Sequence, residues 1–165
     1  RKDLAIVSDG GRPKIGYLRK DLINDIEQFL GYDNTTDAVL IGAGKLGQAL
    51  MGYTGFDEYG LNILAAFDAN PTKEQTDEGQ PIYHISMLEE YCREHRVLMG
   101  IITVPAEYAQ SVADKLIAGG IKAIWTFAPT HLDVPDNILV QYENMATSLA
   151  VLSVHLQTQI KEEKE

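Results

Sequence analysis

One short run of the sequence has the residue types and spacing of a dinucleotide-binding loop. It consists of Gly42, Ala43, Gly44, Lys45, Leu46 and Gly47, spaced as G-x-G-x-x-G. The first glycine permits a tight turn, the second lets the backbone approach a pyrophosphate, and the third lets a helix lie close to a strand. The free N–H groups at the start of that helix attract phosphate. No P-loop Lys-Ser/Thr pair follows, so the run favours binding of a dinucleotide or a related adenine nucleotide over phosphoryl transfer.

A carboxylate completes this pattern. Asp68 ends the next apolar run, Leu61–Phe67, about 20 residues beyond the glycines, which is the fingerprint spacing. It can accept hydrogen bonds from the adenosine ribose diol and would repel a 2′-phosphate. NAD(H) is therefore favoured over NADP(H), and the alternative is a solvated loop aspartate before Asn70-Pro71.

Two further loops follow apolar runs and are expected at the same sheet edge. Thr103, Val104, Pro105 and Ala106 follow one run, and Phe127, Ala128 and Pro129 follow the next. Ligands bind outside the carboxyl ends of strands in doubly wound sheets, so we expect both loops to wall the nicotinamide side. The alternative for each is a loop without a ligand. His131 lacks a paired carboxylate or lysine, which favours a structural or solvated role, and the four histidines have no metal-ligand spacing.

The elements that position these loops alternate between strand and helix patterns. Short apolar runs lie at 38–41, 61–67, 81–84, 98–103 and 121–127. Helical patterns lie at 18–30, 44–53, 86–95 and from Pro105 to Gly119-Gly120, with Gly31 ending the first and a capping box, Ser86-x-x-Glu89, opening the third. This alternation predicts an α/β fold, a Rossmann-like, doubly wound and mainly parallel sheet.

The C-terminal region has a different pattern. Met145, Leu149, Leu152, Leu156 and Ile160 form an apolar stripe at helical spacing. A long connector, 128–143, precedes it and contains a short candidate strand, Leu139–Tyr142. The helix either packs on its own sheet or is exchanged with a partner subunit.

Composition narrows the class of protein further. The 165 residues carry a net charge of −10, which disfavours a general nucleic-acid binder. Residues 1–20 are nonetheless basic, with six Lys/Arg and two Asp/Glu, so they are either a solvated arm or the edge of a DNA-contacting element. The chain opens at Arg1 without an initiator Met or signal peptide, so we expect a fragment of a longer cytoplasmic protein. Its single cysteine, Cys92, is expected to be a buried structural thiol.

Taken together, these motifs resemble the NADH-binding part of the Rex family of bacterial redox-sensing transcriptional repressors. The glycine run, 65–68, 103–106 and 127–129 match family landmarks in the same order. Arg1–Ala5 and Arg12–Tyr17 resemble the end and the basic wing of the family's winged-helix domain. The resemblance implies a homodimer that senses NADH/NAD, binds DNA through an N-terminal winged helix that is largely missing here, and exchanges its terminal helices.

The resemblance also implies three segments and a sensing pair. The segments are a winged-helix remnant at 1–17, an NAD(H)-binding domain with a leading helix at 18–143, and a dimerisation helix at 144–165. Family members pair a tyrosine on the nucleotide-binding helix with an aspartate on the partner's arm. Tyr53 stands at the tyrosine position, and Asn144 replaces the aspartate, which removes a formal charge.

Two other functions remain open on the residues alone. The chain can be the nucleotide-binding piece of an NAD-dependent oxidoreductase, although little sequence remains for a substrate domain. It can also be a CoA-binding domain, whose glycine loop is related. CoA carries a phosphate on its adenosine ribose, which Asp68 should disfavour. No catalytic residue is assigned, and the favoured function is a ligand-binding regulatory domain rather than an enzyme.

Overall fold

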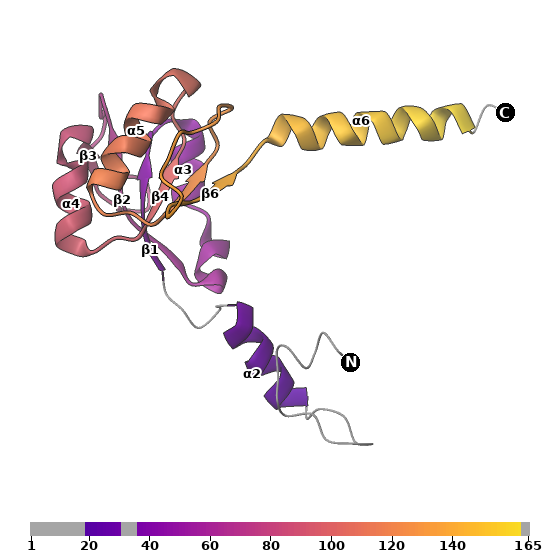
Figure 1. Cartoon of the computed structure of the whole chain (residues 1–165), viewed down its shortest axis with the longest axis horizontal. Coiled ribbons are helices and arrows are strands. Elements are labelled where there is room, and N and C mark those ends of the chain that lie inside the picture. Colours follow the sequence, from indigo (N-terminus) through magenta and orange to yellow (C-terminus); the bar gives the residue numbers. More distant parts are fainter. Residues whose placement is uncertain (1–18, 31–35, 163–165) are drawn as a thin grey trace.

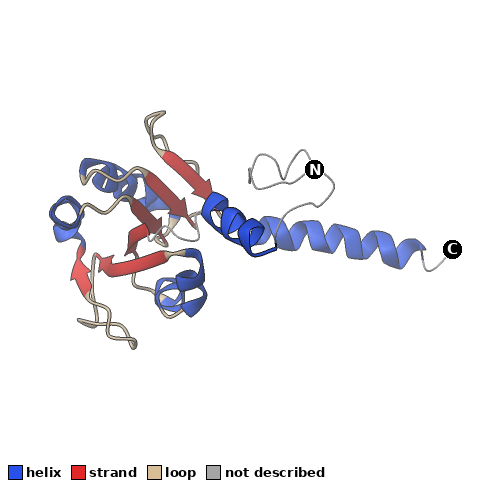
Figure 2. Ribbon diagram, turned by 90° about the horizontal axis from the view of Figure 1, so that it is seen from below, coloured by secondary structure: helices blue, strands red, loops and turns tan. Residues whose placement is uncertain are grey.

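The computed structural model describes residues 19–30 and 36–162 (Figures 1 and 2). The expectations for the basic N-terminal arm, for Leu18 and for Gly31 as a helix end lie outside these residues. Among the described residues, no helix combines the length and the hydropathy that a membrane span needs.

A six-stranded sheet forms the centre of the molecule, with the strand order β3-β2-β1-β4-β5-β6. All five pairings are parallel. The strands are β1 (Thr36–Ile41), β2 (Leu61–Asp68), β3 (Ile82–His84), β4 (Met99–Ile102), β5 (Ala123–Thr126) and β6 (Leu139–Tyr142). The sequence order reverses between β1 and β4, so the sheet is doubly wound as predicted, and its ligand-binding position is the edge above these two strands.

Helices precede, connect and follow the strands. They are α2 (Arg19–Leu30), α3 (Lys45–Met51), α4 (Leu88–His95), α5 (Ala106–Ala118) and α6 (Met145–Glu162), with short 3-10 helices η1 (Thr54–Tyr59) and η2 (Ile85–Met87). Helix α5 ends at Ala118 because Gly119 caps it and Gly120 adopts φ +98°. The predicted capping box is wrong: η2 precedes α4, and the Ser86 hydroxyl lies 2.8 Å from His84 Nδ1.

Right-handed crossovers decide which face of the sheet each helix covers. Helices α4 and α5 bury their apolar sides on one face, together with Leu132 and Ile138 from the β5–β6 connection. Helix α3 and η1 cover the other face beside β1 and β2. The crossovers after β3 lie on the first face, so among the described residues no helix covers β4, β5 and β6 on the second face.

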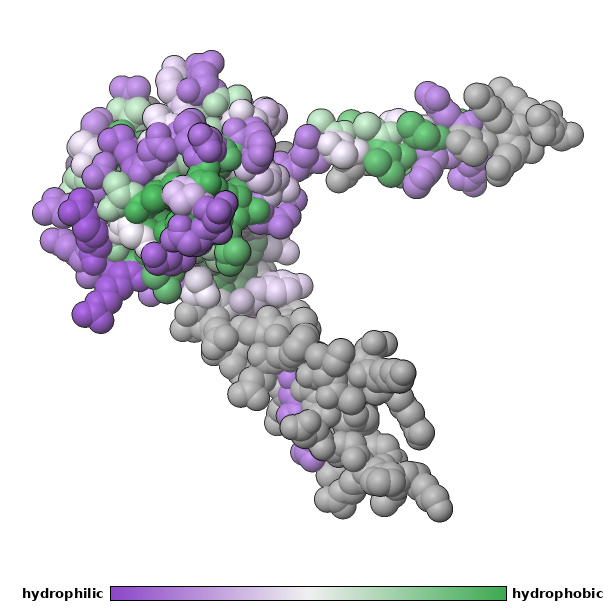
Figure 3. Space-filling model, in the orientation of Figure 1, coloured by the Kyte–Doolittle hydropathy of each residue, from purple (hydrophilic) through white to green (hydrophobic). Residues whose placement is uncertain are grey.

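Helix α6 extends away from this body (Figure 1). Its apolar residues Leu149, Leu152, Leu156 and Ile160 are between 42% and 64% exposed, and Figure 3 shows hydrophobic surface along the helix. The helix therefore does not cover its own sheet, which was one of the two expectations for this stripe.

Cys92, on the buried side of α4, is fully buried in the core. Burial raises the pKa of its thiol to about 11, because the thiolate loses its hydration there. The prediction of a buried structural thiol is confirmed.

Candidate functional site

The glycine loop follows β1 directly and makes a tight turn at Gly42. This residue is buried with φ +104°, a conformation that side chains other than glycine's rarely adopt. Its N–H donates to the Phe67 carbonyl (2.8 Å), which joins the loop to the end of β2. A Cβ at this position would also lie 3.0 Å from Thr103. The turn therefore requires glycine for both conformation and space.

The other two glycines have contrasting surroundings. A Cβ on Gly47 would overlap the Gly42 carbonyl oxygen and approach Leu40 to 2.9 Å, so this glycine sets how closely α3 lies to β1. Gly44 is exposed with φ −72°, and a Cβ there would meet nothing within 4 Å. Within the protein itself, Gly44 therefore leaves open space at the start of α3.

Asp68 is held against the loop rather than free in solvent. Its Oδ2 accepts from the Ala43 N–H and its Oδ1 accepts from the Asn70 N–H, both at 2.8 Å. The side chain is half-buried at the carboxyl end of β2. The carboxylate is thus fixed beside the glycine loop, as the dinucleotide fingerprint requires.

Thr103 closes the loop from the side of β4. Its hydroxyl lies 3.0 Å from the Ile41 carbonyl and 2.8 Å from the Gly42 carbonyl and donates to this pair. Its N–H also donates to the Ile41 carbonyl. These bonds join the ends of β1 and β4 at the point where the strand order reverses.

A cavity of about 550 Å³ brings six of the predicted residues together. Its lining includes Gly42, Gly44, Asp68, Thr103, Val104 and Pro105, all predicted from the sequence. It also includes Ile85, Tyr108, Val112 and Lys115, which the sequence analysis missed. The last three lie four and three residues apart along α5, so they occupy one helical face and that spacing was the available signal.

The charged side chains in the lining of this cavity are Asp68, from β2, and Lys115, from α5. Lys115 Nζ lies 3.6 Å from Glu89 Oε1, which places one ammonium group at the wall. A hydrogen bond to the Glu107 carboxylate raises the pKa of Tyr108 above its usual value. The wall is otherwise largely apolar, as a site for an adenine ring would be.

A second, smaller cavity of about 310 Å³ lies on the other side of the Asp68 carboxylate. Ala43, Gly44 and Lys45 line it, together with Gln48. The Gln48 amide donates to the Ala43 carbonyl at 2.8 Å and so fixes the loop from within α3. Leu46 is half-buried behind the loop.

The loop after β5 does not line either of these cavities. Phe127 packs beside Trp125 at 4.8 Å between ring centroids, whereas Ala128 is buried and Pro129 exposed. Ala128 and Pro129 line a cavity of about 450 Å³ together with His131, Tyr142, Glu143 and Asn144. The structure therefore separates this predicted part of the site from the glycine loop.

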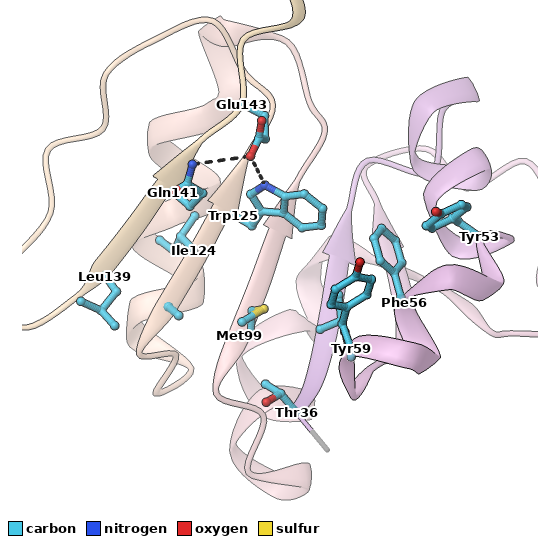
Figure 4. Close-up of a pocket in the computed structure, with 12 residues that line it drawn as sticks. Thr36, Tyr53, Phe56, Tyr59, Met99, Ile124, Trp125, Leu139, Gln141 and Glu143 are labelled. Carbon is cyan, nitrogen blue, oxygen red and sulfur yellow. Dashed lines mark hydrogen bonds between the residues drawn. The ribbon is translucent and has the colours of Figure 1, made fainter. Parts of the chain in front are cut away.

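Tyr53 and Asn144 line different cavities within the single chain. Tyr53 is 58% exposed and lines a groove of about 460 Å³ on the uncovered face of the sheet (Figure 4). The rest of that groove is mostly apolar and includes Phe56, Tyr59, Met99, Trp125 and Leu139. Asn144 instead caps α6, because its Oδ1 accepts from the Thr147 N–H at 3.1 Å.

The described part of the chain contains no group of three or more His, Cys, Asp or Glu side chains that could hold a metal ion. The cavity beside the glycine loop offers backbone N–H groups, one fixed carboxylate and apolar walls. Such a cavity suits recognition of a dinucleotide by its phosphates, ribose and adenine.

Comparisons with known proteins agree with this geometry. Residues 33–130, the span of the glycine loop and the first five strands, belong to the family described as CoA binding domain. A redox-sensing transcriptional repressor Rex of Treponema denticola is 43% identical over 159 residues, covering 96% of this chain and 76% of the relative. The Rex protein of Porphyromonas gingivalis is 45% identical over 152 residues, covering 92% and 70%.

Solved structures extend the match to the whole fold. RSP, a Rex-family repressor solved with β-NAD⁺ and operator DNA, has a TM-score of 0.89 and 33% identity, covering 99% of this chain and 76% of that chain. RSP in complex with β-NADH gives 0.86 at the same identity, covering 99% and 77%. The relatives are repressors, which confirms the prediction of a regulatory protein rather than an enzyme. The chain belongs to the Rex family of redox-sensing transcriptional repressors.

Proposed function

We propose that this chain binds NADH and NAD⁺ at the carboxyl ends of β1, β2 and β4, and that the two redox forms favour different arrangements of a dimer. The cavity that joins Gly42, Gly44, Asp68 and Thr103 is the observation that carries this proposal. The pyrophosphate lies against Gly44 and the first N–H groups of α3, where the protein leaves open space.

Asp68 binds the adenosine ribose. Its two oxygens already accept backbone N–H groups, so the carboxylate is oriented before the ligand arrives. A ribose diol adds donors to the remaining lone pairs, whereas a 2′-phosphate would place a second anion beside the carboxylate. NAD(H) is therefore preferred to NADP(H). The adenine lies in the apolar part of the cavity, near Ile85 and Tyr108.

The nicotinamide extends from the glycine loop toward Thr103, Val104 and Pro105. Phe127, Ala128 and Pro129 form its far wall. The first loop follows β4 and the second follows β5, and these two strands are neighbours in the sheet. The Phe127 ring contacts Trp125, and Trp125 in turn contacts Phe56. Because Trp125 and Phe56 line the groove that contains Tyr53, this wall adjoins that groove.

A second copy of the chain covers the apolar groove with its α6. Two apolar surfaces in the described part of the chain support this proposal: the exposed stripe Leu149, Leu152, Leu156 and Ile160, and the groove around Trp125 and Leu139. Exchange of α6 would bury both at once. It would also bring Asn144 of a second copy toward Tyr53, the pair that the family resemblance implies.

Binding then acts on DNA through population shift. A ligand changes the dimer only by as much as its affinity differs between two arrangements, so NADH must favour one of them more strongly than NAD⁺ does. RSP was solved with operator DNA, and we assign residues 1–17 of this chain to the edge of a DNA-binding element. The other segments are the NAD(H)-binding domain, 18–143, and the dimerisation helix, 144–165. A repressor of this kind works in the cytoplasm, and no hydride transfer is required.

Calorimetric titration tests this function. The chain should bind NADH more tightly than NAD⁺, bind NADPH weakly, and leave the NADH absorbance unchanged on standing. Steady loss of that absorbance with an electron acceptor would instead indicate an oxidoreductase.

The family match at 33–130 supports CoA as a second candidate. CoA carries a phosphate on its adenosine ribose, which Asp68 opposes. CoA should therefore fail to displace NADH, and displacement at comparable concentration would favour the CoA-binding function.

A further inference from the structure

Helix α6 is directed by the three residues that precede it, Tyr142, Glu143 and Asn144, which we call the arm base. The described side chains of α6 are exposed, and Figure 1 shows the helix leaving the body at the end of β6. The contacts of the arm base therefore determine where the helix points.

Tyr142 ties the arm base to the loop after β5. Its hydroxyl lies 2.8 Å from His131 Nδ1 and accepts from the Leu132 N–H at 3.1 Å. The Tyr142 and His131 rings also meet edge to face, at 5.5 Å between centroids. Leu132 is buried in the core beneath α5, so one end of this connection is rigid.

Glu143 ties the arm base to β5 itself. Its N–H donates to the Thr126 carbonyl at 2.8 Å, and its carboxylate accepts from Trp125 Nε1–H at 3.2 Å (Figure 4). These bonds continue the pairing of β5 with β6. They hold Glu143 to a strand, whereas Tyr142 is the member of the arm base whose side chain reaches the loop.

The loop that Tyr142 reaches is the one that carries Ala128 and Pro129. Both residues line the same cavity as His131, Tyr142 and Asn144. A shift of that loop on ligand binding would therefore move His131 and Leu132 against the Tyr142 hydroxyl, immediately before the first turn of α6.

We propose that Tyr142 is a positioning residue that transmits the state of the loop after β5 to the direction of α6, with His131 as its partner. The inference rests on the proposed function, since it requires NADH to bind near this loop. It predicts that loss of the Tyr142 hydroxyl uncouples the helix from the cofactor while leaving the cofactor site intact.

The test compares Tyr142→Phe with wild type and with a matched control, Tyr83→Phe. Tyr83 lies on β3, at the opposite edge of the sheet from β6. The substitution Gln157→Cys, at an exposed position of α6, provides the site for a spin label, and buried Cys92 is left in place. Two measurements follow: NADH affinity by calorimetry, and the label-to-label distance in the dimer with and without NADH.

We expect Tyr142→Phe to bind NADH within about threefold of wild type and to keep its melting temperature. It should lose at least half of the NADH-induced change in label distance, and Tyr83→Phe should lose none. His131→Ala, a change of an exposed side chain, should reduce the change in the same direction. A purely structural hydroxyl would lower the melting temperature without changing the response to NADH.

Four results would overturn the proposal. A full distance change in Tyr142→Phe would show that the hydroxyl transmits nothing. Loss of NADH binding in that variant alone would place Tyr142 in the cofactor site itself. If wild type binds NADH without any distance change, the coupling is absent although the proposed cofactor stands; if wild type binds no NADH, the proposed function falls and the coupling with it.

Discussion

Replacing Gly44 by alanine should remove most of the NADH affinity without weakening the fold. A Cβ at this position meets nothing within 4 Å, and the backbone at φ −72°, ψ −170° accepts alanine without strain. Changes of this kind alter the free energy of unfolding by about 0.5 kcal/mol or less. The stability cost should therefore be negligible.

The cost to binding comes from the ligand side. The methyl group would occupy the space left for the pyrophosphate and push it away from the N–H groups of α3. A hydrogen bond to a charged group contributes about 1.5–3 kcal/mol, so losing one weakens binding roughly 10- to 150-fold. The assay is calorimetric titration with NADH, beside thermal unfolding of the same preparation.

Gly47→Ala is the matched control. Its Cβ would overlap the Gly42 carbonyl oxygen, so α3 must move away from β1 and the melting temperature should fall as well. The reasoning would be refuted if Gly44→Ala bound NADH within about twofold of wild type, or if it unfolded as readily as Gly47→Ala.

Three further predictions follow from other parts of the structure. Asp68→Ala should weaken NADH binding and reduce the preference for NADH over NADPH, measured by competition titration. An unchanged preference for NADH would exclude Asp68 from the ribose site. Cys92 should react with a thiol reagent at pH 8 only after unfolding, because burial raises its pKa to about 11. Since the unfolded thiol ionises at its ordinary pKa of 9.0, the free energy of unfolding in urea should fall as the pH rises from 9.0 to about 11, and a Cys92→Ala variant should show a smaller fall. Leu152→Asp with Leu156→Asp should yield a folded monomer in sedimentation experiments, and a stable dimer would show that α6 is not the interface.

The sequence predicted those parts of the fold that local pattern determines. Short apolar runs identified the strands of the parallel sheet, because a strand buried on both faces needs continuous apolar residues. Gly42 and Gly47 were predictable for a related reason, since no other residue fits those backbone positions.

Features that depend on tertiary approach were missed. The segment Thr54–Tyr59 has no helical apolar repeat and folds as a 3-10 helix beside β2. The capping box failed because His84 interacts with the Ser86 side chain before α4 begins.

The missed parts of the candidate site have the same cause. Tyr108 and Lys115 reach the ligand cavity only because α5 packs across the end of β4. The pairing of Tyr142 with His131 joins a strand to a loop through side chains, and no periodicity in the sequence marks such a pair.

The central claim is that this chain distinguishes reduced from oxidised nicotinamide dinucleotide by binding alone. Parallel calorimetric titrations with NADH, NAD⁺, NADPH and CoA test it most directly, with absorbance recorded throughout. We predict tighter binding of NADH than of NAD⁺, weak binding of NADPH and CoA, and no consumption of NADH. Equal affinity for the two redox forms, or preference for CoA, would contradict the account.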